Sequence, residues 1–235
     1  MSSMTSFTPA RRSETSGGKV RILLVDDHEL VRFGTTRLIE SQPDLEVCGE
    51  AEDAPTAIRL ARSLSPEMAI IDLSLRVGSG LDVVRAIRQD DPHVRTIVCS
   101  AHDERLYAPR ALRAGARGYV NKQQSAQLLI GAIRKVLDGQ LALSPAMTEE
   151  ILQRAAGMTV RNSDPLESLS DRELQVFEQI GEGASVSEIA THLSISPKTV
   201  EFHRARIREK LGLASNTLLL RQAFAWTVER GMSLS

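Results

Sequence analysis

The chain has 235 residues, a length that suits two domains better than one compact domain. Its hydrophobic fraction is 42%, which is ordinary for a globular protein, and no apolar run approaches the ~20 residues that a membrane-spanning helix needs. The net charge is −1, so the composition as a whole carries no basic signature of nucleic-acid binding. Any such function has to rest on local charge.

The N-terminal segment and the two cysteines favour a simple interpretation. Residues 1–18 are rich in Ser, Thr and Gly and lack the apolar core of a signal peptide, so we expect a disordered tail. Cys48 and Cys99 each lie in an apolar run that predicts a buried strand. We interpret them as small core residues of a cytoplasmic protein rather than as a disulfide or metal ligands.

Between residues 19 and 139, short apolar runs alternate with amphipathic stretches. Runs that are apolar throughout are typical of parallel strands covered on both faces. Five such β-α units predict an α/β domain with a doubly wound five-stranded parallel sheet. The predicted strands are Val20–Val25, Leu45–Cys48, Met68–Ile71, Thr96–Cys99 and Tyr119–Val120. The predicted helices lie near His28–Ser41, Pro55–Leu64, Leu81–Gln89, Glu104–Ala114 and Ala126–Leu137.

The alternation ends before the last third of the chain. Ala155–Ser168 has little apolar periodicity and indicates a linker. Ser144–Arg154 predicts a capped helix that either domain could own, so we expect a linker with a helical segment at residues 140–166.

Residues 167–235 contain no strand signal and predict a four-helix domain. Ser170 followed by Glu173 indicates a capping box at the start of its first helix. Further helices are expected after Ser185, Ser196 and Ser215.

Polar side chains follow four strands of the predicted sheet. Asp26 and Asp27 end the first strand, Asp72 the third and Ser100 the fourth, while Lys122 follows the fifth. Sites in open parallel sheets gather beyond the carboxyl ends of the strands, so we expect these side chains to converge. Clustered carboxylates repel one another and favour a bound cation, and oxygen ligands suit Mg²⁺.

A carboxylate in such a site can also act as a nucleophile towards phosphorus. Asp72 stands alone at its strand end, which makes it the candidate, with Asp26 and Asp27 left to hold the metal. Lys122 is expected to neutralise phosphoryl charge, and Ser100 to donate a hydrogen bond to a phosphoryl oxygen. Each acid taken singly has a structural interpretation as a helix cap or a solvent-facing group, but the joint placement at four strand ends favours a site.

Three segments resemble the motifs of response-regulator receiver domains, and the resemblance covers roughly Val20 to Gly139. They are Val25-Asp26-Asp27-His28, Ile70-Ile71-Asp72-Leu73-Ser74-Leu75 and Ala114-Gly115-Ala116-Arg117-Gly118-Tyr119-Val120-Asn121-Lys122.

The resemblance implies a flavodoxin-like receiver fold and a set of roles. Asp72 receives a phosphoryl group from a histidine kinase. The chain catalyses only its own phosphorylation and dephosphorylation, and is not an enzyme that acts on a separate substrate. The implied Mg²⁺ ligands are Asp26, Asp27, Asp72 and the backbone carbonyl of Ser74. The implied switch pair is Ser100 and Tyr119, in which Ser100 moves towards the phosphoryl group and Tyr119 rotates inward, and Lys122 is the basic residue.

One position departs from the receiver pattern. Receivers usually carry Pro four residues after the acceptor, whereas this chain has Arg76, followed by Val77-Gly78-Ser79-Gly80. A flexible, positively charged loop beside the pocket leaves donor docking and phosphoryl lifetime open, although it removes no ligand.

The segment from Ser187 to Val200 predicts a helix-turn-helix, and its second helix is basic. From Ser196 to Leu211 there are five basic residues against two acidic ones, a local net charge of +3. Val200, Ile207 and Leu211 share one helical face, which we expect to pack on the domain core. A basic helix presented in this way fits the major groove of DNA.

The opposite face supplies the candidate DNA contacts. Basic side chains at its edges are expected to contact phosphates, Glu201 to accept from a cytosine amino group, and Phe202 and Ala205 to touch a thymine methyl. Arg204 is expected to reach outward from the core flank, while His203 is interpreted as partly buried. The full set is Lys198, Thr199, Glu201, Phe202, Arg204, Ala205, Arg206 and Arg208.

Leu169–Leu174, Glu182–Ala190 and Ser196–Gly212 resemble the LuxR-type output domain. Joined to a receiver, this domain is similar to the NarL/FixJ class of response regulators, which implies binding to double-stranded DNA as a homodimer. In that class the last helix, here about Asn216 to Glu229, often forms the dimer contact. Leu218, Leu219, Ala223 and Trp226 suit such a contact and suit a core position equally well.

Two alternatives stay open. The first is an enzyme, a phosphatase or phosphotransferase that uses Asp72 as its nucleophile. Ser74 stands where the haloacid-dehalogenase pattern has a second Asp, which disfavours it. The second is a phosphorylation-independent DNA-binding protein whose receiver is a dimerisation module. The complete acidic pocket disfavours this second alternative, whereas Arg76, in place of the usual proline, leaves it open.

Overall fold

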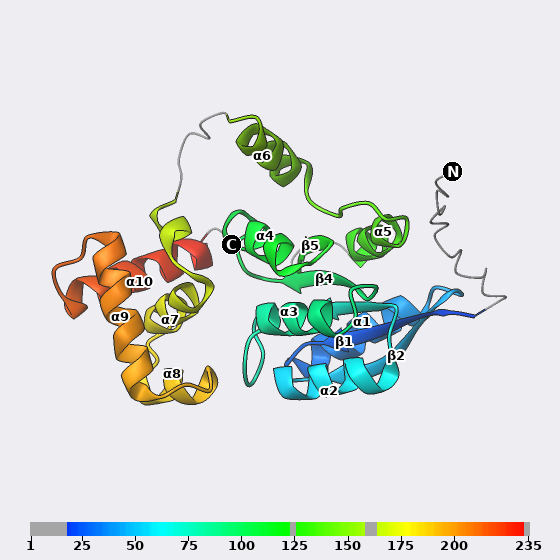
Figure 1. Cartoon of the computed structure of the whole chain (residues 1–235), viewed down its shortest axis with the longest axis horizontal. Helices are drawn as coiled ribbons and strands as arrows, with labels where there is room; N and C mark the ends of the chain where they lie inside the picture. Colours follow the sequence, from blue (N-terminus) through cyan, green and yellow to red (C-terminus); the bar gives the residue numbers. More distant parts are fainter. Residues whose placement is uncertain (1–17, 123–125, 158–163, 233–235) are drawn as a thin grey trace, which may run out of the picture.

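The structure, a computed structural model, describes residues 18–122, 126–157 and 164–232. The tail expected at residues 1–18 lies outside the described residues except for Gly18. The described chain forms an α/β domain followed by a helical domain, with a helix on the connection between them (Figure 1). None of the helices within these ranges is long and apolar enough to cross a membrane.

Five parallel strands form a single sheet in the order β2-β1-β3-β4-β5, which confirms the predicted fold class. β1 and β3 are neighbours, although β2 lies between them in the chain. The strands are β1 (Val20–Val25), β2 (Leu45–Ala51), β3 (Met68–Ile71), β4 (Arg95–Ser100) and β5 (Gly118–Asn121).

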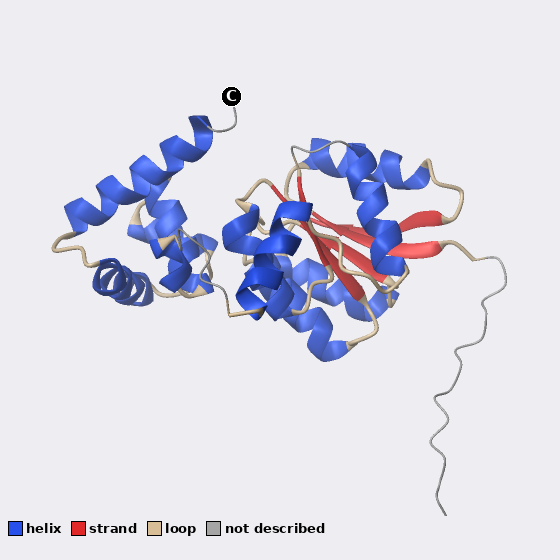
Figure 2. Cartoon of the chain, turned by 90° about the horizontal axis from the view of Figure 1, so that it is seen from above, coloured by secondary structure: helices blue, strands red, loops and turns tan. Residues whose placement is uncertain are grey.

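Helices cover both faces of this sheet (Figure 2). Two helices pack on one face, α1 (Glu29–Glu40) and α5 (Ala126–Leu137). The other face is covered by α2 (Ala54–Leu64), α3 (Gly80–Asp90) and α4 (Glu104–Ala114).

The strand side chains explain why the runs are apolar throughout. Leu23 and Val25 belong to the core beneath α2, α3 and α4, whereas Ile22 and Leu24 belong to the core beneath α1 and α5. Successive side chains of a strand point to opposite faces, so a sheet buried on both faces requires an apolar residue at every position.

Helix α6 (Pro145–Ala155), where the sequence predicts a helix at Ser144–Arg154, lies against α4 of the α/β domain. The Ser144 hydroxyl caps α6 by accepting a hydrogen bond from the Met147 amide at 3.1 Å. The Ser144 amide donates to Glu104 on α4 at 3.1 Å, and the Met147 side chain is buried. The chain before α6 also pairs with the edge strand β5, through a parallel bridge between Gly118 and Ala142.

The second domain begins with a short 3-10 helix, η1 (Pro165–Ser168), and continues with four α-helices. The capping box predicted at Ser170 and Glu173 is confirmed, and a second one joins Ser185 and Glu188. The same Ser-x-x-Glu spacing in the sequence marks both. The helices are α7 (Asp171–Gly181), α8 (Val186–His192), α9 (Pro197–Leu211) and α10 (Asn216–Met232).

Gly80 lets α3 begin directly against the end of β3. Its amide donates to the Leu73 carbonyl at 3.1 Å, and a Cβ at this position would lie 2.0 Å from the Asp72 carbonyl oxygen. Only a residue without a side chain permits this approach between the helix and the chain that carries Asp72.

We expect Gly80→Ala to destabilise the protein by about 1–3 kcal/mol, because the clash is with backbone atoms that cannot rotate away. The control is Gly34→Ala, at an exposed position of α1 with no atom within 4 Å of the added Cβ. This substitution should stabilise the helix by about 0.5–1 kcal/mol. Urea unfolding measures both, and equal midpoints for the two variants would refute the close-approach argument.

Candidate functional site

The three aspartates that end β1 and β3 meet at the carboxyl edge of the sheet, as predicted. The Asp26 amide donates to the Ala51 carbonyl at 3.0 Å, and the Asp72 amide donates to the Val25 carbonyl at 2.8 Å. These bonds continue the strand ladders into the site. Ligand atoms of Asp26, Asp27, His28 and Asp72 lie within 4.8 Å of one another.

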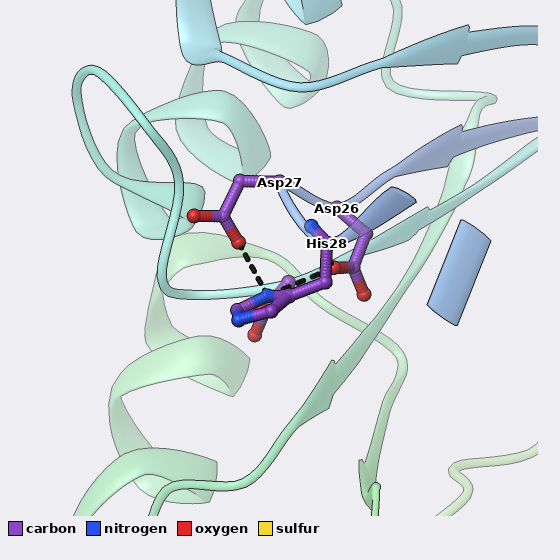
Figure 3. A group of neighbouring side chains, drawn as sticks. Asp26, Asp27 and His28 are labelled. Carbon is purple, nitrogen blue, oxygen red and sulfur yellow. Dashed lines mark hydrogen bonds and ion pairs between the residues drawn. The ribbon is translucent and has the colours of Figure 1, made fainter. Parts of the chain in front are cut away.

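His28 also belongs to this cluster, although it is not among the residues predicted for the site. Its Nδ1 lies 2.7 Å from a carboxylate oxygen of Asp27 and 3.5 Å from one of Asp26 (Figure 3). Its side chain is 64% exposed, so it closes the outer rim of the cluster rather than the interior. Its position directly after Asp27 is the sequence signal that would have included it.

Lys122 neutralises part of the acidic charge from within the pocket. Its Nζ lies 2.6 Å from a carboxylate oxygen of Asp26 and 2.6 Å from one of Asp72. The Lys122 amide donates to the Ser100 carbonyl at 3.0 Å, which fixes the chain after β5 against the end of β4. One ammonium therefore bridges two buried carboxylates.

The buried charges shift one another's ionisation. Burial raises the pKa of Asp72, and the nearby Lys122 ammonium offsets only part of this effect. Burial also lowers the pKa of Lys122, but attraction by Asp72 and Asp26 outweighs burial and holds that pKa above its ordinary value. The ionised Asp72 carboxylate is thus short of positive charge in the absence of a further cation.

The donor set fits a divalent cation with a preference for oxygen ligands. Asp72 Oδ1 is buried and has no hydrogen-bond partner among the described residues. A buried carboxylate oxygen without a partner is costly and invites a ligand of positive charge. Carboxylates from Asp26, Asp27 and Asp72 around this atom are ligands of the kind that Mg²⁺ takes.

Ser100 and Tyr119, the expected switch pair, lie beside the pocket, and both are buried. Ser100 is fully buried at the end of β4, and its hydroxyl oxygen lies 3.5 Å from the His102 amide that donates to it. Tyr119 is only 3% exposed, and its hydroxyl donates to the His102 carbonyl at 2.8 Å. Tyr119 therefore lies inward in this conformation, with its hydroxyl bonded to the His102 carbonyl.

His102 joins this site through its side chain as well. One ring nitrogen, Nε2, lies 2.8 Å from the hydroxyl of Ser74, the residue two positions after Asp72. His102 in turn stands two positions after Ser100. This position near a strand end is a weak sequence signal, because His102 is neither an acid nor a hydroxyl residue.

Arg76 pairs with Glu52, in the turn after β2. Its guanidinium lies 3.1 Å from a carboxylate oxygen of Glu52, and its amide donates to the Glu52 carbonyl at 3.3 Å. A proline at this position has no amide hydrogen and could not make the second bond. These two contacts join the loop after β3 to the turn after β2. The positive charge of Arg76 is paired with Glu52 in this turn.

The second domain presents a helix-turn-helix formed by α8 and α9. Ser194 adopts a left-handed conformation, with φ 54°, in the turn between them. The Ser196 hydroxyl caps α9 by accepting from the Thr199 amide at 3.1 Å. Val200 and Ile207 of α9 are fully buried and Leu211 packs partly buried against the same core, as predicted.

The opposite face of α9 is open. Phe202 is 59% exposed, and the guanidinium of Arg206 lies over its ring, 5.8 Å from the centroid. Lys198, Glu201 and Ala205 are exposed on the same helix. This surface is the candidate nucleic-acid interface.

Five charged side chains of α9 are engaged within the protein. Arg204 pairs with Glu201 at 2.8 Å and Arg206 with Glu209 at 2.9 Å, in ion pairs three residues apart along the helix that add little stability. Lys210 donates to the Ser168 carbonyl at 3.0 Å and to Glu173 at 2.6 Å, which ties α9 to the start of α7. The local charge of +3 counted from the sequence is therefore smaller on the open face.

Helix α10 divides between core and surface. Leu219 and Ala223 are fully buried, and Trp226 packs edge-on against Phe177 of α7, with 5.8 Å between the ring centroids. These three residues serve the core, which leaves Leu218 as the exposed member of the expected set. Other apolar side chains of α10 are exposed, namely Leu220, Phe224 and Val228.

Comparisons with known proteins agree with this architecture. Residues 22–134 match the family described as the response regulator receiver domain, and residues 167–223 match the bacterial regulatory proteins of the luxR family. The response regulator GacA of Pseudomonas aeruginosa is 33% identical over 85% of this chain and 93% of its own length. The response regulator UvrY of Escherichia coli is 34% identical over 83% of this chain and 88% of its own length.

Solved structures show the same likeness. RcsB of Salmonella enterica serovar Typhimurium, bound to promoter DNA in the presence of a phosphomimetic, superposes with a TM-score of 0.66 at 25% identity, over 88% of this chain and 98% of that one. A LuxR-family response regulator from Aurantimonas is 40% identical, with a TM-score of 0.55, over 59% of this chain and 99% of its own. The chain therefore belongs to the two-component response regulators of the NarL/FixJ class, with a receiver domain followed by a LuxR-type helix-turn-helix domain.

Proposed function

We propose that this chain is a phosphorylation-dependent transcription regulator in which Asp72 accepts a phosphoryl group from a histidine kinase and thereby controls sequence-specific DNA binding by α9. The observation that carries the proposal is the buried, unpartnered Oδ1 of Asp72 inside a pocket that also holds Asp26, Asp27 and Lys122. The exposed basic face of α9 on the same chain supports the second half of the proposal.

The proposed reaction is a direct transfer of the phosphoryl group to Asp72. A carboxylate oxygen of Asp72 attacks the phosphorus of a phosphohistidine, the new P–O bond forms, and the P–N bond to the donor imidazole breaks with its electron pair remaining on nitrogen. When bound, Mg²⁺ supplies charge neutralisation for the phosphoryl oxygens. Asp26, Asp27, Asp72 and the Ser74 carbonyl are the proposed ligands.

Lys122 and Ser100 act on the product. The Lys122 ammonium already lies 2.6 Å from Asp72, so a small movement of its flexible stem brings it to a phosphoryl oxygen. The buried Ser100 hydroxyl can donate to another phosphoryl oxygen when it turns away from the His102 amide. Movement of Ser100 is the proposed signal, and Tyr119, whose hydroxyl is bonded to the His102 carbonyl, is the second member of the proposed switch pair.

The proposed DNA partner is double-stranded, and the proposed assembly is a homodimer. Arg206 and Lys198 are proposed to contact phosphates, and Phe202 and Ala205 to touch a thymine methyl. Leu220, Phe224 and Val228 are spaced four residues apart along α10, so they form one exposed apolar stripe that suits a contact between two copies. The structure of RcsB bound to promoter DNA supports this use of the fold.

Asp72→Asn should abolish covalent labelling by radiolabelled acetyl phosphate with Mg²⁺, because the amide is not a nucleophile towards phosphorus. Asp91→Asn, a surface change in the loop before β4, is the control and should label like the parent chain. Labelling of the Asp72 variant at unchanged stoichiometry would assign the acceptor elsewhere. Turnover of generic phosphomonoesters would favour the enzyme alternative.

Mg²⁺ should stabilise the unphosphorylated protein by binding the folded pocket. At a Mg²⁺ concentration of about tenfold Kd the gain is about 1.4 kcal/mol, which raises Tm by roughly 3–5 °C. Asp72→Asn should lose most of this rise, since one ligand and one negative charge are gone. Because burial raises the pKa of Asp72, its ionised form disfavours folding at neutral pH, so metal-free Asp72→Asn should unfold no earlier than the parent.

Arg206→Ala should weaken DNA binding several-fold and reduce the slope of log affinity against log salt by about 1, because one phosphate contact is lost. The control is Arg113→Ala, which removes the same charge from an exposed position of the receiver helix α4. A fluorescence-anisotropy titration at several salt concentrations measures both. An unchanged slope for Arg206→Ala would place this side chain away from the phosphates.

A further inference from the structure

A second cavity lies at the edge of the receiver sheet opposite the acidic pocket. It has a volume of about 560 Å³ and lies where β4 and β5 begin, between the carboxyl ends of α3, α4 and α5. Arg95 is the first residue of β4, and Arg117 directly precedes β5. None of the described residues that line this cavity belongs to the proposed phosphorylation site, which is at the other ends of the same strands.

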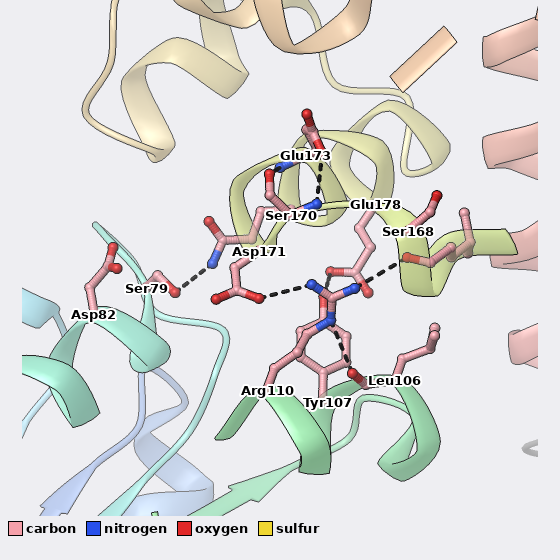
Figure 4. Close-up of polar contacts among 12 residues, drawn as sticks. Ser79, Asp82, Leu106, Tyr107, Arg110, Ser168, Ser170, Asp171, Glu173 and Glu178 are labelled. Carbon is pink, nitrogen blue, oxygen red and sulfur yellow. Dashed lines mark hydrogen bonds and ion pairs between the residues drawn. The ribbon is translucent and has the colours of Figure 1, made fainter. Parts of the chain in front are cut away.

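The charge of this cavity is positive. The guanidinium groups of Arg88, Arg95 and Arg117 line it, and the described lining residues include no Asp or Glu. None of these three side chains forms an ion pair or a hydrogen bond with any residue that the structure describes. Arg110 of the neighbouring helix α4, by contrast, is paired with Asp171 at 2.8 Å (Figure 4). Three positive charges therefore share one cavity without a counter-charge.

Nearby negative charge does not balance them. Asp90 at the end of α3 pairs with Arg62 of α2 at 2.7 Å, and Asp91 accepts a hydrogen bond from the His93 amide at 2.9 Å. The carboxyl end of a helix carries roughly half a negative charge, so three such ends offset only about half of the charge of three guanidinium groups. The remaining positive charge favours an anion.

The backbone fixes two of the arginines at the start of their strands. The Arg117 amide donates to the Thr96 carbonyl at 2.7 Å, and its carbonyl accepts from the Ala142 amide at 2.9 Å. The Arg95 amide donates to the Glu67 carbonyl at 3.1 Å. Donors that are held in place before a ligand arrives lose less freedom when it binds.

Gly115 makes room for the third arginine. Arg88 lies in the last turn of α3, and its stem crosses the carboxyl end of α4 at this glycine. Gly115 has φ 120°, and a Cβ there would clash with Cδ of Arg88. The absence of a side chain at position 115 therefore lets Arg88 lie beside the cavity.

Apolar side chains contribute to the same lining. They include Leu112, Val136 and Leu141, of which Leu141 is 52% exposed. The volume lies within the range of roughly 300–1,000 Å³ that is usual for small-molecule sites. An inorganic phosphate would leave these apolar groups in water, whereas an organic phosphate can cover them.

We propose that this cavity binds a small organic phosphate of about the size of a nucleoside monophosphate. Its phosphate group accepts hydrogen bonds from Arg88, Arg95 and Arg117, and its organic part contacts the apolar lining. Guanidinium groups suit phosphate because each can donate two parallel hydrogen bonds to it. The site uses no residue of the acidic pocket, so it does not depend on the proposed function of Asp72.

The test is a calorimetric titration of the full chain with adenosine monophosphate, inorganic phosphate or adenosine. Mg²⁺ is left out, and about 0.15 M salt screens loose surface attraction. Arg95→Gln and Arg117→Gln each remove one guanidinium group. The matched control is Arg59→Gln, because Arg59 is an exposed residue of α2 that forms no ion pair with any described residue and does not line the cavity. Leu141→Ser removes apolar lining and leaves the charges.

Adenosine monophosphate should bind the parent chain more tightly than inorganic phosphate or adenosine does. Its half-saturating concentration should rise about tenfold or more in Arg95→Gln and in Arg117→Gln, and should stay unchanged in Arg59→Gln. Leu141→Ser should weaken the binding of adenosine monophosphate and leave that of inorganic phosphate unchanged. Thermal unfolding checks that each variant is folded, and the exposed Arg117 can be replaced without disturbing the core.

Two results would overturn this site. One is no binding of adenosine monophosphate to the parent chain, and the other is equal binding by Arg117→Gln and Arg59→Gln. Equal affinities for adenosine monophosphate and inorganic phosphate would overturn the organic part of the ligand.

Discussion

The receiver depends on one shared ion pair, in which the Lys122 ammonium lies 2.6 Å from both Asp26 and Asp72. Without it, two carboxylates that are nearly inaccessible to water would repel each other with no compensation, at a cost of several kcal/mol. With it, the repulsion between the carboxylates is reduced. The pocket is still short of positive charge, because one buried oxygen of Asp72 has no hydrogen-bond partner among the residues that the structure describes. This shortage of positive charge links the structure to the proposed chemistry, because it favours the binding of a divalent ion next to the proposed phosphoryl acceptor.

The fold produces that ion pair from residues that are far apart in the chain. Placing β3 next to β1 brings Asp72 beside Asp26, and placing β5 next to β4 brings Lys122 over the end of Ser100's strand. Parallel strands deliver all these residues to the same edge. The bare backbone of Gly80 then lets α3 return close enough to support the segment that carries Asp72. Topology and one missing side chain therefore position the pocket together.

The features that a residue carries in its own neighbourhood could be predicted from the sequence, whereas those that depend on a distant partner could not. The apolar runs predict all five strands, and Ser170 with Glu173 predicts the start of α7, because burial on two faces and capping are local rules. The acids at the strand ends follow from the sheet alone. Lys210, by contrast, counts towards the basic charge of α9 in the sequence until the structure pairs it with Glu173, and the contacts of His102 with Ser74 and Glu178 are visible only in the fold.

The domain interface joins charged contacts to a shared apolar core. Asp171 is an acidic residue in the first turn of α7, where it also favours the helix, and it meets two guanidinium groups across the interface. Buried ion pairs add little net stability, because desolvation offsets most of their attraction, yet they tolerate few alternative geometries. Buried apolar side chains of both domains form one cluster and supply the burial that ion pairs lack. The charged contacts of α7 therefore fix how the two domains meet, while the apolar contacts hold them together.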